Sequence, residues 1–268
     1  MIDTHCHLDV AAFDADRDAV IARAAVAGVV GALIPAIRPR TWAQLAAIAR
    51  AHPAVDLRVA IGIHPQIAGE LAGDELPRDR AGAVDVAALV DTIVAGAAAH
   101  RDRAVAIGEC GLDGNSADRD AQAATLRAHV HAARATGLPL VLHVFRAHDA
   151  ALRILRDEHA ETVGGVLHSY SGGADLVPVY ADLGLAFSFA GPVTYTNARR
   201  PVAAARAVPR GLLLAETDAP DQAPHPHRGG RSEPAFVADV IAGLAAARGD
   251  DAAALCLANA RRIFSAWV

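Results

Sequence analysis

The sequence predicts an α/β protein, a single (β/α)8 TIM barrel. Short apolar runs alternate with segments of helical spacing eight times along the chain. The apolar runs do not alternate with polar residues, which is typical of parallel strands that are buried on both faces. The length of 268 residues suits one such barrel. Neither a shift in composition nor a repeat of 20–50 residues divides the chain, so we expect one domain over residues 1–268.

The expected strands are the opening residues up to His7, then 29–35, 57–62, 104–108, 140–142, 165–167, 185–189 and 211–215. The expected helices cover 14–27, 41–51, 85–100, 118–136, 149–158, 174–183, 197–207, 233–248 and 251–267. Gly28 and Gly137 follow two of these helices, as helix-ending glycines commonly do. Residues 69–82 and 222–232 lack periodicity and predict loops. A doubly wound open sheet is the alternative, but no Gly-x-Gly-x-x-Gly follows the first strand.

The composition limits the chemistry of the protein. Hydrophobic residues make up 53% of the chain, which is enough for a large core, and the formal net charge is −5. This charge gives no general attraction to nucleic acid, so any phosphate must be bound locally by arginines or metal ions. All 25 basic residues are arginines. The absence of lysine excludes a Schiff base, a lysine general base and a carboxylated lysine that bridges metals.

Three cysteines, Cys6, Cys110 and Cys256, show no Cys-x-x-Cys spacing. Their odd number argues against a disulfide framework and favours a reducing compartment. The N-terminal residues do not resemble a secretory signal, and no uncharged apolar run of 18 residues predicts a membrane span. We therefore expect a cytoplasmic protein.

Chemically reactive side chains follow the expected strands. In a (β/α)8 barrel the active site lies at the carboxyl ends of the strands. The residues at these ends are five histidines and two carboxylates: His5, His7, His64, Glu109, His143, His168 and Asp218. The first two histidines, spaced i, i+2, point to the same side of an extended strand. The remaining eight histidines are expected on solvated faces: His52, His100, His129, His131, His148, His159, His225 and His227.

Imidazoles and carboxylates in this number predict a metal site. Four histidines and two carboxylates exceed the three or four protein ligands that one zinc ion takes, so two divalent ions with a bridging carboxylate are expected. Such a pair lowers the pKa of bound water and stabilises an in-line displacement. The mixed N/O ligands admit Zn, Mn, Mg, Co or Ni, and the many imidazoles favour the transition metals.

Five segments resemble the successive motifs of the TatD-like metal-dependent hydrolases. They are His-Cys-His-Leu-Asp at 5–9, Ile-Gly-Ile-His-Pro at 61–65, Gly-Glu-Cys-Gly-Leu-Asp at 108–113, Leu-His-Ser-Tyr-Ser-Gly at 167–172 and Glu-Thr-Asp-Ala-Pro at 216–220. Their order and approximate spacing match the TatD DNase family from Met1 to Phe264. The resemblance implies an amidohydrolase-type barrel, with members that act as deoxyribonucleases on phosphodiester bonds through metal-bound hydroxide.

The resemblance also implies a set of six metal ligands: His5, His7, Glu109, His143, His168 and Asp218. The first two histidines and the aspartate would bind one ion. The glutamate would bridge this ion to a second one, held by the other two histidines. No carboxylated lysine is needed in such a site, because the glutamate takes that role.

The catalytic residues implied by the resemblance are Asp218, Glu109 and His64. Asp218 would take the proton from the attacking water, and His64 would face the scissile phosphate rather than a metal. The implied partner is DNA or a nucleotide-like phosphoester substrate. No membrane partner is expected, and we expect a monomer or a weak homo-oligomer.

The chain departs from the family pattern around the substrate. Phe145 stands where the family usually has arginine, and Arg146, which follows it, should point the other way on a continuous strand. Gly114 replaces a usual aromatic residue, and Ser232 stands where asparagine is frequent. Two alternatives therefore stay open: a metal-dependent amidohydrolase or lactonase acting on a small molecule, and a metal-binding protein with impaired catalysis.

Residues beside the expected ligands have more ordinary interpretations. Asp9 and Asp113 are predicted either to orient ligands or to accept backbone hydrogen bonds in turns. Glu216 is expected to hydrogen-bond a histidine or a backbone amide rather than to bind metal. Cys6 and Cys110 alternate with ligands along their strands, so we expect them to point away from the site into the core.

Overall fold

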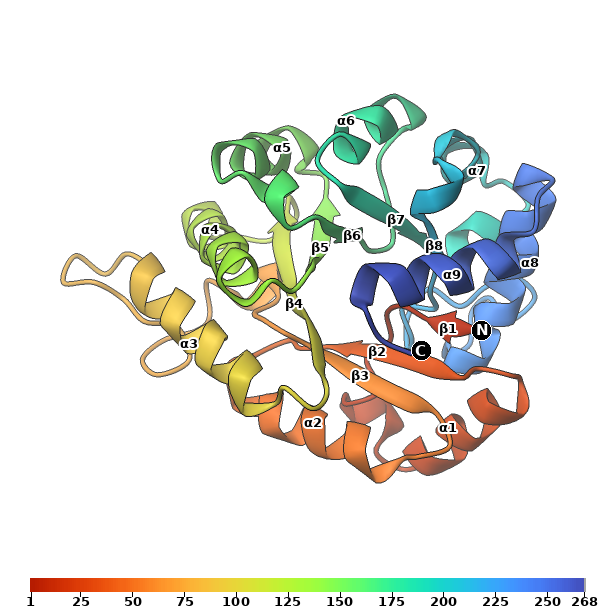
Figure 1. Cartoon of the computed structure of the whole chain (residues 1–268), viewed down its shortest axis with the longest axis horizontal. Coiled ribbons are helices and arrows are strands. Elements are labelled where there is room, and N and C mark those ends of the chain that lie inside the picture. Colours follow the sequence, from red (N-terminus) through yellow and green to blue (C-terminus); the bar gives the residue numbers. More distant parts are fainter. Residues whose placement is uncertain (268) are drawn as a thin grey trace.

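The computed structural model describes residues 1–267 and shows eight parallel strands that form one sheet in sequential order (Figure 1). The strands are β1 (Ile2–Asp3), β2 (Gly31–Pro35), β3 (Asp56–Ile61), β4 (Ala104–Asp113), β5 (Leu140–Phe145), β6 (Gly165–Leu167), β7 (Leu185–Phe189) and β8 (Leu213–Ala215). A doubly wound sheet reverses its strand order, and this sheet does not. The predicted (β/α)8 barrel is therefore confirmed.

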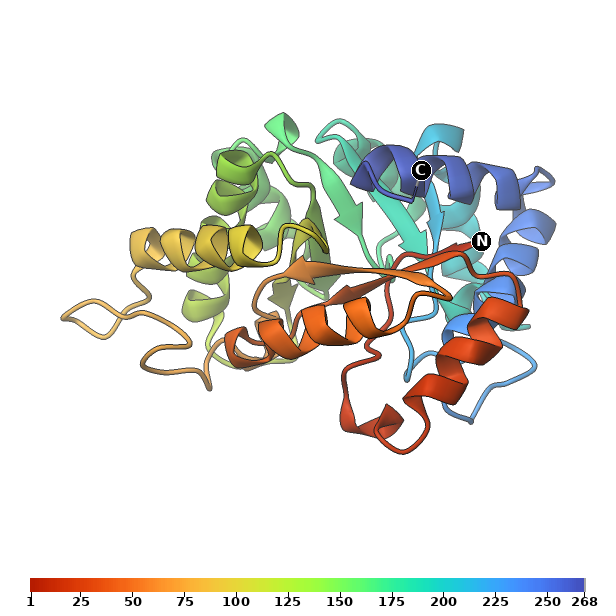
Figure 2. The same cartoon turned by 60° about the horizontal axis from the view of Figure 1, so that its bottom comes forward.

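Nine α-helices within residues 1–267 surround the strands (Figures 1 and 2). They are α1 (Arg17–Val26), α2 (Trp42–Ala51), α3 (Val86–Ala99), α4 (Arg119–Thr136), α5 (His148–Asp157), α6 (Val177–Ala181), α7 (Arg199–Ala207), α8 (Val237–Arg248) and α9 (Ala252–Phe264). The helix expected over 174–183 is shorter than predicted. A 3-10 turn at Ala174–Leu176 precedes it, and Pro178, which lacks a backbone N–H, lies in its first turn.

The barrel closes between the segments that follow β1 and β8. The backbone N–H of Asp218 donates to the carbonyl of His5 at 2.9 Å, and the N–H of His7 donates to the carbonyl of Ala219 at 2.7 Å. A parallel bridge joins Cys6 to Ala219 between these bonds. The hydrogen bonds that close the barrel therefore also bring the first and last predicted ligands together.

The end of the barrel away from the predicted site is filled by apolar side chains. Each strand contributes at least one to a common cluster: Ile2, Leu33, Ala60, Val105, Ala106, Val141, Val166, Ala186 and Leu214. Phe264 at the end of α9 and Trp267 complete the cluster. The Trp267 indole N–H donates to the carbonyl of Asp56 at 2.7 Å, so the C-terminal segment seals this end against β3.

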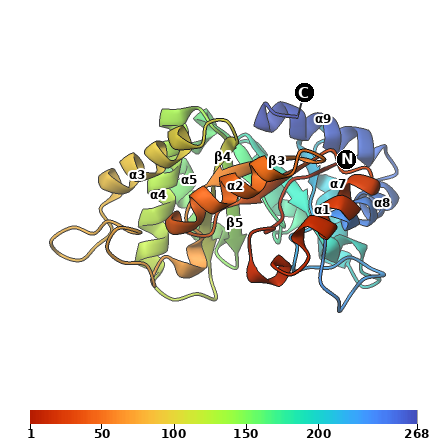
Figure 3. The same ribbon diagram turned by 90° about the horizontal axis from the view of Figure 1, so that it is seen from below.

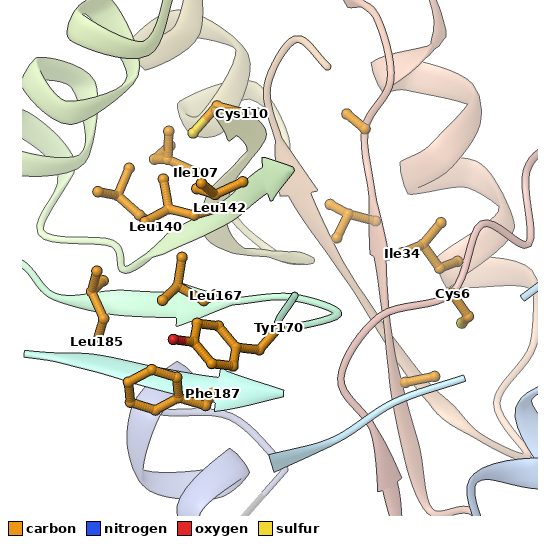
Figure 4. Packing of buried hydrophobic residues seen from close by; sticks show 14 of the residues in the cluster. Cys6, Ile34, Ile107, Cys110, Leu140, Leu142, Leu167, Tyr170, Leu185 and Phe187 are labelled. Atoms are coloured by element: carbon orange, nitrogen blue, oxygen red, sulfur yellow. The ribbon is translucent and has the colours of Figure 1, made fainter. Parts of the chain in front are cut away.

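A second, larger cluster fills the space between the strands and the helices. Figure 4 shows the side chains of Leu140, Leu167 and Leu185 from three successive strands gathered on one side of the sheet. Tyr170 and Phe187 meet edge to face there, with ring centroids 5.0 Å apart. Cys6 and Cys110 are fully buried in this cluster as free thiols, so the expectation that they point into the core is confirmed.

β4 is longer than predicted. It continues to Asp113, whereas the apolar run ends at Gly108. The extension exists because β5 also continues, so that Gly111 pairs with His143 and Asp113 pairs with Phe145. The two strands thus carry their polar residues out to the mouth of the barrel.

The long connection between β3 and α3 includes the expected irregular stretch over residues 69–82, which projects from the body of the protein (Figure 3). Among the helices of residues 1–267, none has both the length and the apolar character that crossing a membrane requires.

Candidate metal centre

The buried carboxylate of Glu109 lies at the centre of the predicted site. It is fully buried in the middle of β4, and its two oxygens face different histidines. Oε2 lies 3.1 Å from Nε2 of His5 and 3.5 Å from Nε2 of His7. The strand expected up to His7 ends at Asp3, and the two histidines that follow it converge on one oxygen of the glutamate.

The second oxygen of Glu109 faces three other histidines. Oε1 lies 3.0 Å from Nε2 of His64, 3.1 Å from Nδ1 of His143 and 2.9 Å from Nε2 of His168. His64 follows β3, His143 lies in β5 and His168 follows β6. The structure thus places His64 as close to the carboxylate as the two histidines that were expected to bind metal.

Asp218 completes the site from the segment after β8. Its Oδ1 lies 3.7 Å from Nε2 of His5 and 3.9 Å from Nε2 of His7. All seven predicted side chains are therefore gathered at one end of the barrel. Their potential ligand atoms form three groups of three, each within 4.8 Å: His5, His7 and Glu109; His5, His168 and Asp218; and His64, Glu109 and His143.

The polar atoms of this cluster fit a divalent cation. Oε2 of Glu109 is buried and has no hydrogen-bond donor within residues 1–267. Nε2 of His5 lies 3.3 Å from Nε2 of His7, and Nδ1 of His143 lies 3.1 Å from Nε2 of His168. Imidazole nitrogens and carboxylate oxygens that converge in this way are ligands of zinc and similar metals. The cluster is therefore able to bind metal.

The protonation of the cluster depends on burial and on its own charges. Burial, and next the neighbouring His5, lower the pKa of His7 to about 3, so His7 is neutral at pH 7, as a ligand must be. Burial acts to lower the pKa of His168, but the carboxylates of Glu109 and then of Glu216 outweigh it and raise that pKa well above its usual value. A buried carboxylate thus favours positive charge beside it.

Two carboxylates outside the cluster orient its histidines. Oδ2 of Asp113 lies 3.1 Å from Nε2 of His143 and also accepts a hydrogen bond from Gln66 at 2.8 Å. Of the two predicted roles for Asp113, orienting a histidine is therefore realised, and its Oδ1 also accepts a turn N–H from Asn115 at 2.8 Å. Such contacts fix the tautomer of a ligand.

Glu216 bonds the partners that were expected. Its Oε1 accepts the backbone N–H of Ser169 at 2.6 Å and lies 3.3 Å from Nδ1 of His168. Asp9 differs, because in the described part of the chain no hydrogen bond joins its carboxylate to a predicted ligand. Its Oδ1 is buried without a partner, and burial raises the pKa of Asp9 to about 6.

Two residues near the site were not predicted. Asp3 is fully buried and accepts hydrogen bonds from the Thr217 hydroxyl at 2.6 Å and from the backbone N–H of His5 at 3.2 Å. Burial raises the pKa of Asp3 to about 8. Gln222 donates to Asp218 Oδ2. Asp3 and Thr217 are 214 positions apart, so no local pattern could have indicated this bond.

Sequence comparison identifies the family. The family described as TatD related DNase matches residues 2–265. The chain belongs to this family. The uncharacterized metal-dependent hydrolase YabD of Bacillus subtilis is 32% identical over 98% of both chains. A protein of Erwinia tasmaniensis named 3'-5' ssDNA/RNA exonuclease TatD is 33% identical over 99% of this chain and all of its own.

Structural comparison agrees with the sequence. The crystal structure of the Escherichia coli TatD homologue YjjV is similar, with a TM-score of 0.84 and 28% identity over 99% of this chain and 98% of the other. The predicted resemblance to the TatD family is confirmed, and with it the prediction of a metal-dependent hydrolase.

The departures from the TatD pattern have a structural explanation. Phe145 lines a cavity beside the cluster, and Arg146 lines a different one between α4 and α5. The Arg146 guanidinium nevertheless lies 5.3 Å from the centre of the Phe145 ring, so the expectation that the two side chains point apart is not met. Arg146 has a left-handed backbone with φ of +51°. Its carbonyl oxygen lies 2.6 Å from where a Cβ on Gly114 would be. The family's aromatic residue therefore has no room at position 114.

Among the eight other histidines, one is fully buried and contradicts the expectation of a solvated face. It is His129; His52, His100, His131 and His148 are half-buried, and His159, His225 and His227 are exposed. His129 is fully buried, with Nε2 accepting the backbone N–H of Ile63 at 3.0 Å and Nδ1 2.7 Å from the carbonyl of Thr125. His148 is half-buried, and its Nδ1 lies 2.9 Å from the Tyr180 hydroxyl. Both have protein partners that offset the loss of water.

Proposed function

We propose that this chain hydrolyses phosphodiester bonds in nucleic acid and that two divalent metal ions bind in its histidine cluster. The observation that carries the proposal is the position of Glu109, whose two oxygens face two separate sets of histidines. A bridging carboxylate needs this arrangement. The nucleic-acid substrate is supported by the family and by the relative named as an exonuclease.

In this proposal the ions would be held by the six predicted ligands: His5, His7, Glu109, His143, His168 and Asp218. Divalent ions would supply Lewis-acid stabilisation of the phosphoryl oxygens and a water of lowered pKa. The imidazole-rich set favours Zn, Mn or Ni over Mg.

The protein residues then have distinct roles. Asp218, at the edge of the cluster and 9% exposed, accepts the proton from the attacking water. His64, whose Nε2 lies 3.0 Å from Oε1 of Glu109, faces the scissile phosphate. Asp113 and Glu216 hold His143 and His168 in the orientation that ligation requires.

The test combines metal analysis with an assay of substrate classes. We expect purified protein to contain close to two equivalents of a transition metal, and to hydrolyse bis-nitrophenyl phosphate and single-stranded DNA when Mn or Zn is added. His143→Ala should lose both properties, whereas His159→Ala, which changes an exposed histidine, should keep them. Turnover of amides or lactones without turnover of phosphodiesters would support an amidohydrolase instead. Metal binding without any turnover would support the non-catalytic alternative.

A further inference from the structure

Two cavities border the metal centre and share three lining residues. One measures about 350 Å³ and the other about 370 Å³, and both are lined by His143, His168 and Asp218. A substrate bound at these residues therefore extends into at least one of the cavities. Both volumes lie within the range of ligand pockets, about 300 Å³ and above.

The two cavities differ in charge. The smaller one includes Arg200 near the start of α7, whereas the larger one includes Asp221 and Glu109 and no arginine. Because the chain has no lysine, Arg200 is the one permanently cationic residue that lines either cavity. Among the ion pairs and hydrogen bonds of residues 1–267, none involves Arg200. Its guanidinium is exposed and free to meet an anion.

The smaller cavity also offers an aromatic face. Phe145 follows His143 by two positions on β5, so the two side chains point to the same side of the strand. Both line the smaller cavity, and Phe145 is half-buried there. The guanidinium of Arg146 lies 5.3 Å from the centre of the Phe145 ring but lines the cavity between α4 and α5. Pro192 and Pro201 add further apolar wall.

We propose that Phe145 and Arg200 form a nucleotide subsite beside the metal centre. The Phe145 ring stacks on the base, and Arg200 pairs with a phosphate of the strand. This inference rests on the proposed function and specifies where its substrate is held. Stacking on an aromatic ring accepts every base, so the subsite recognises single-stranded nucleic acid without strong sequence preference.

The role of Arg200 can be measured without turnover. The probe is pentathymidylate with a 5′ fluorescein, and its binding is followed by fluorescence anisotropy in EDTA. We expect Arg200→Gln to weaken binding about tenfold and to reduce the slope of log K against log salt by about 0.7, as for one phosphate contact on a single strand. The matched control is Arg199→Gln, which removes the neighbouring exposed arginine of α7 that lines neither cavity. It should change binding less than twofold.

The role of Phe145 is tested with a second probe that lacks the 3′-terminal base. We expect Phe145→Leu to weaken binding of pentathymidylate about tenfold and to leave binding of the abasic probe within twofold of wild type. Thermal melting shows whether both variants are folded. A loss of about 1 kcal/mol in stability lowers Tm by about 2–4 °C, so each variant should melt within this range of the wild type.

Three outcomes overturn the subsite. In the first, Arg200→Gln and Arg199→Gln weaken binding of pentathymidylate equally. In the second, Arg146→Gln weakens this binding more than Arg200→Gln does. In the third, Phe145→Leu weakens binding of pentathymidylate and of the abasic probe equally. Hydrolysis of DNA by the wild type in any of these cases leaves the proposed function intact. Conversely, the variants could show the expected differences in binding while the wild type hydrolyses no phosphodiester. This result would reject the proposed function and support the subsite.

Discussion

Asp113 shows how one residue outside the cluster controls a ligand. Its carboxylate faces Nε2 of His143, which leaves Nδ1 directed at Glu109. The hydrogen bond from His143 holds the pKa of Asp113 below its usual value, so the carboxylate is charged at neutral pH. We expect Asp113→Asn to lower metal affinity or activity by about 10–100-fold, because the tautomer of His143 is no longer fixed.

Metal titration of the chelated protein measures this effect. The control is Asp120→Asn, which changes an exposed carboxylate in the first turn of α4. Equal metal affinities for the two variants would show that Asp113 does not act on His143.

His129 is not a proposed ligand, yet it makes the stability of the fold depend on pH. Burial lowers its pKa to about 4, whereas a solvated histidine titrates near 6.5. Between these values the unfolded chain binds more protons than the folded chain, so this contribution to stability is complete above pH 6.5 and is lost as the pH falls toward 4. The loss from this residue is about 2 kcal/mol at pH 5 and about 3 kcal/mol at pH 4.

Urea unfolding of wild type and His129→Gln at pH 7 and pH 5 isolates this term. Glutamine can still accept the N–H of Ile63 but does not titrate. The wild type should lose about 2 kcal/mol more than the variant between the two pH values. Parallel losses would mean that His129 is protonated in the folded protein.

Single residues show where sequence reasoning succeeds and where it ends. His5 and His143 were predictable because each follows an apolar run, and strand ends in a barrel meet at one mouth. His129 was assigned to a solvated face because its partner, the N–H of Ile63, is 66 positions away. Asp3 was missed for the same reason, since Thr217, which donates to it, is 214 positions away in the sequence.

At the scale of elements, β4 depends on a glycine that the sequence did not mark as part of a strand. Gly111 has φ of +141°, and a Cβ there would overlap the carbonyl oxygen of His143 on β5. We expect Gly111→Ala to destabilise the protein by about 1–3 kcal/mol from the backbone conformation alone. Metal affinity should also fall, because the overlap displaces the strand that carries His143.

The control for Gly111→Ala is Gly211→Ala. Gly211 has an ordinary backbone conformation and open space around its missing Cβ, so its variant should stay within about 0.5 kcal/mol of wild type. Urea unfolding and metal titration compare the two. Full metal affinity in Gly111→Ala would show that β5 holds His143 independently of β4.

The lengths of the elements were less predictable than their order. β6 and β7 have the predicted lengths because neighbouring residues in the sequence, among them the glycines before each apolar run, mark where the strand begins. β4 reaches Asp113 only because β5 pairs with it there, and that partner is not visible in a local pattern. α6 is shortened by a 3-10 turn although its spacing looked helical.

At the scale of the molecule, the two ends of the barrel differ. The predicted ligands lie at the polar end, the mouth, and the apolar cluster that includes Ile2 and Trp267 fills the opposite end, here called the floor. At least one residue from each strand fills the floor, so every strand contacts the same cluster. This arrangement supports the prediction of one domain over residues 1–268, which stays a prediction, as do the cytoplasmic location and the monomeric or weakly associated state. Strand order and the convergence of ligands followed from the repeat of eight apolar runs, whereas the sealing of the floor by Trp267 had no signal beyond its apolar character.

Trp267 provides a test of whether floor and mouth are independent. It is 5% exposed, and a Cβ on Gly31 would overlap its ring, so β2 is shaped to receive it. Trp267→Ala should cost about 3–5 kcal/mol. Each kcal/mol lowers Tm by about 2–4 °C in a chain of this size, so a fall on the order of 10 °C is expected. Val26→Ala, which trims a side chain that is 91% exposed, should leave Tm nearly unchanged.

Because the ligands lie at the opposite end, Trp267→Ala should retain its metal affinity at temperatures well below its Tm. A parallel loss of metal affinity and stability would instead show that the barrel transmits changes in its floor to the ligands through the strands.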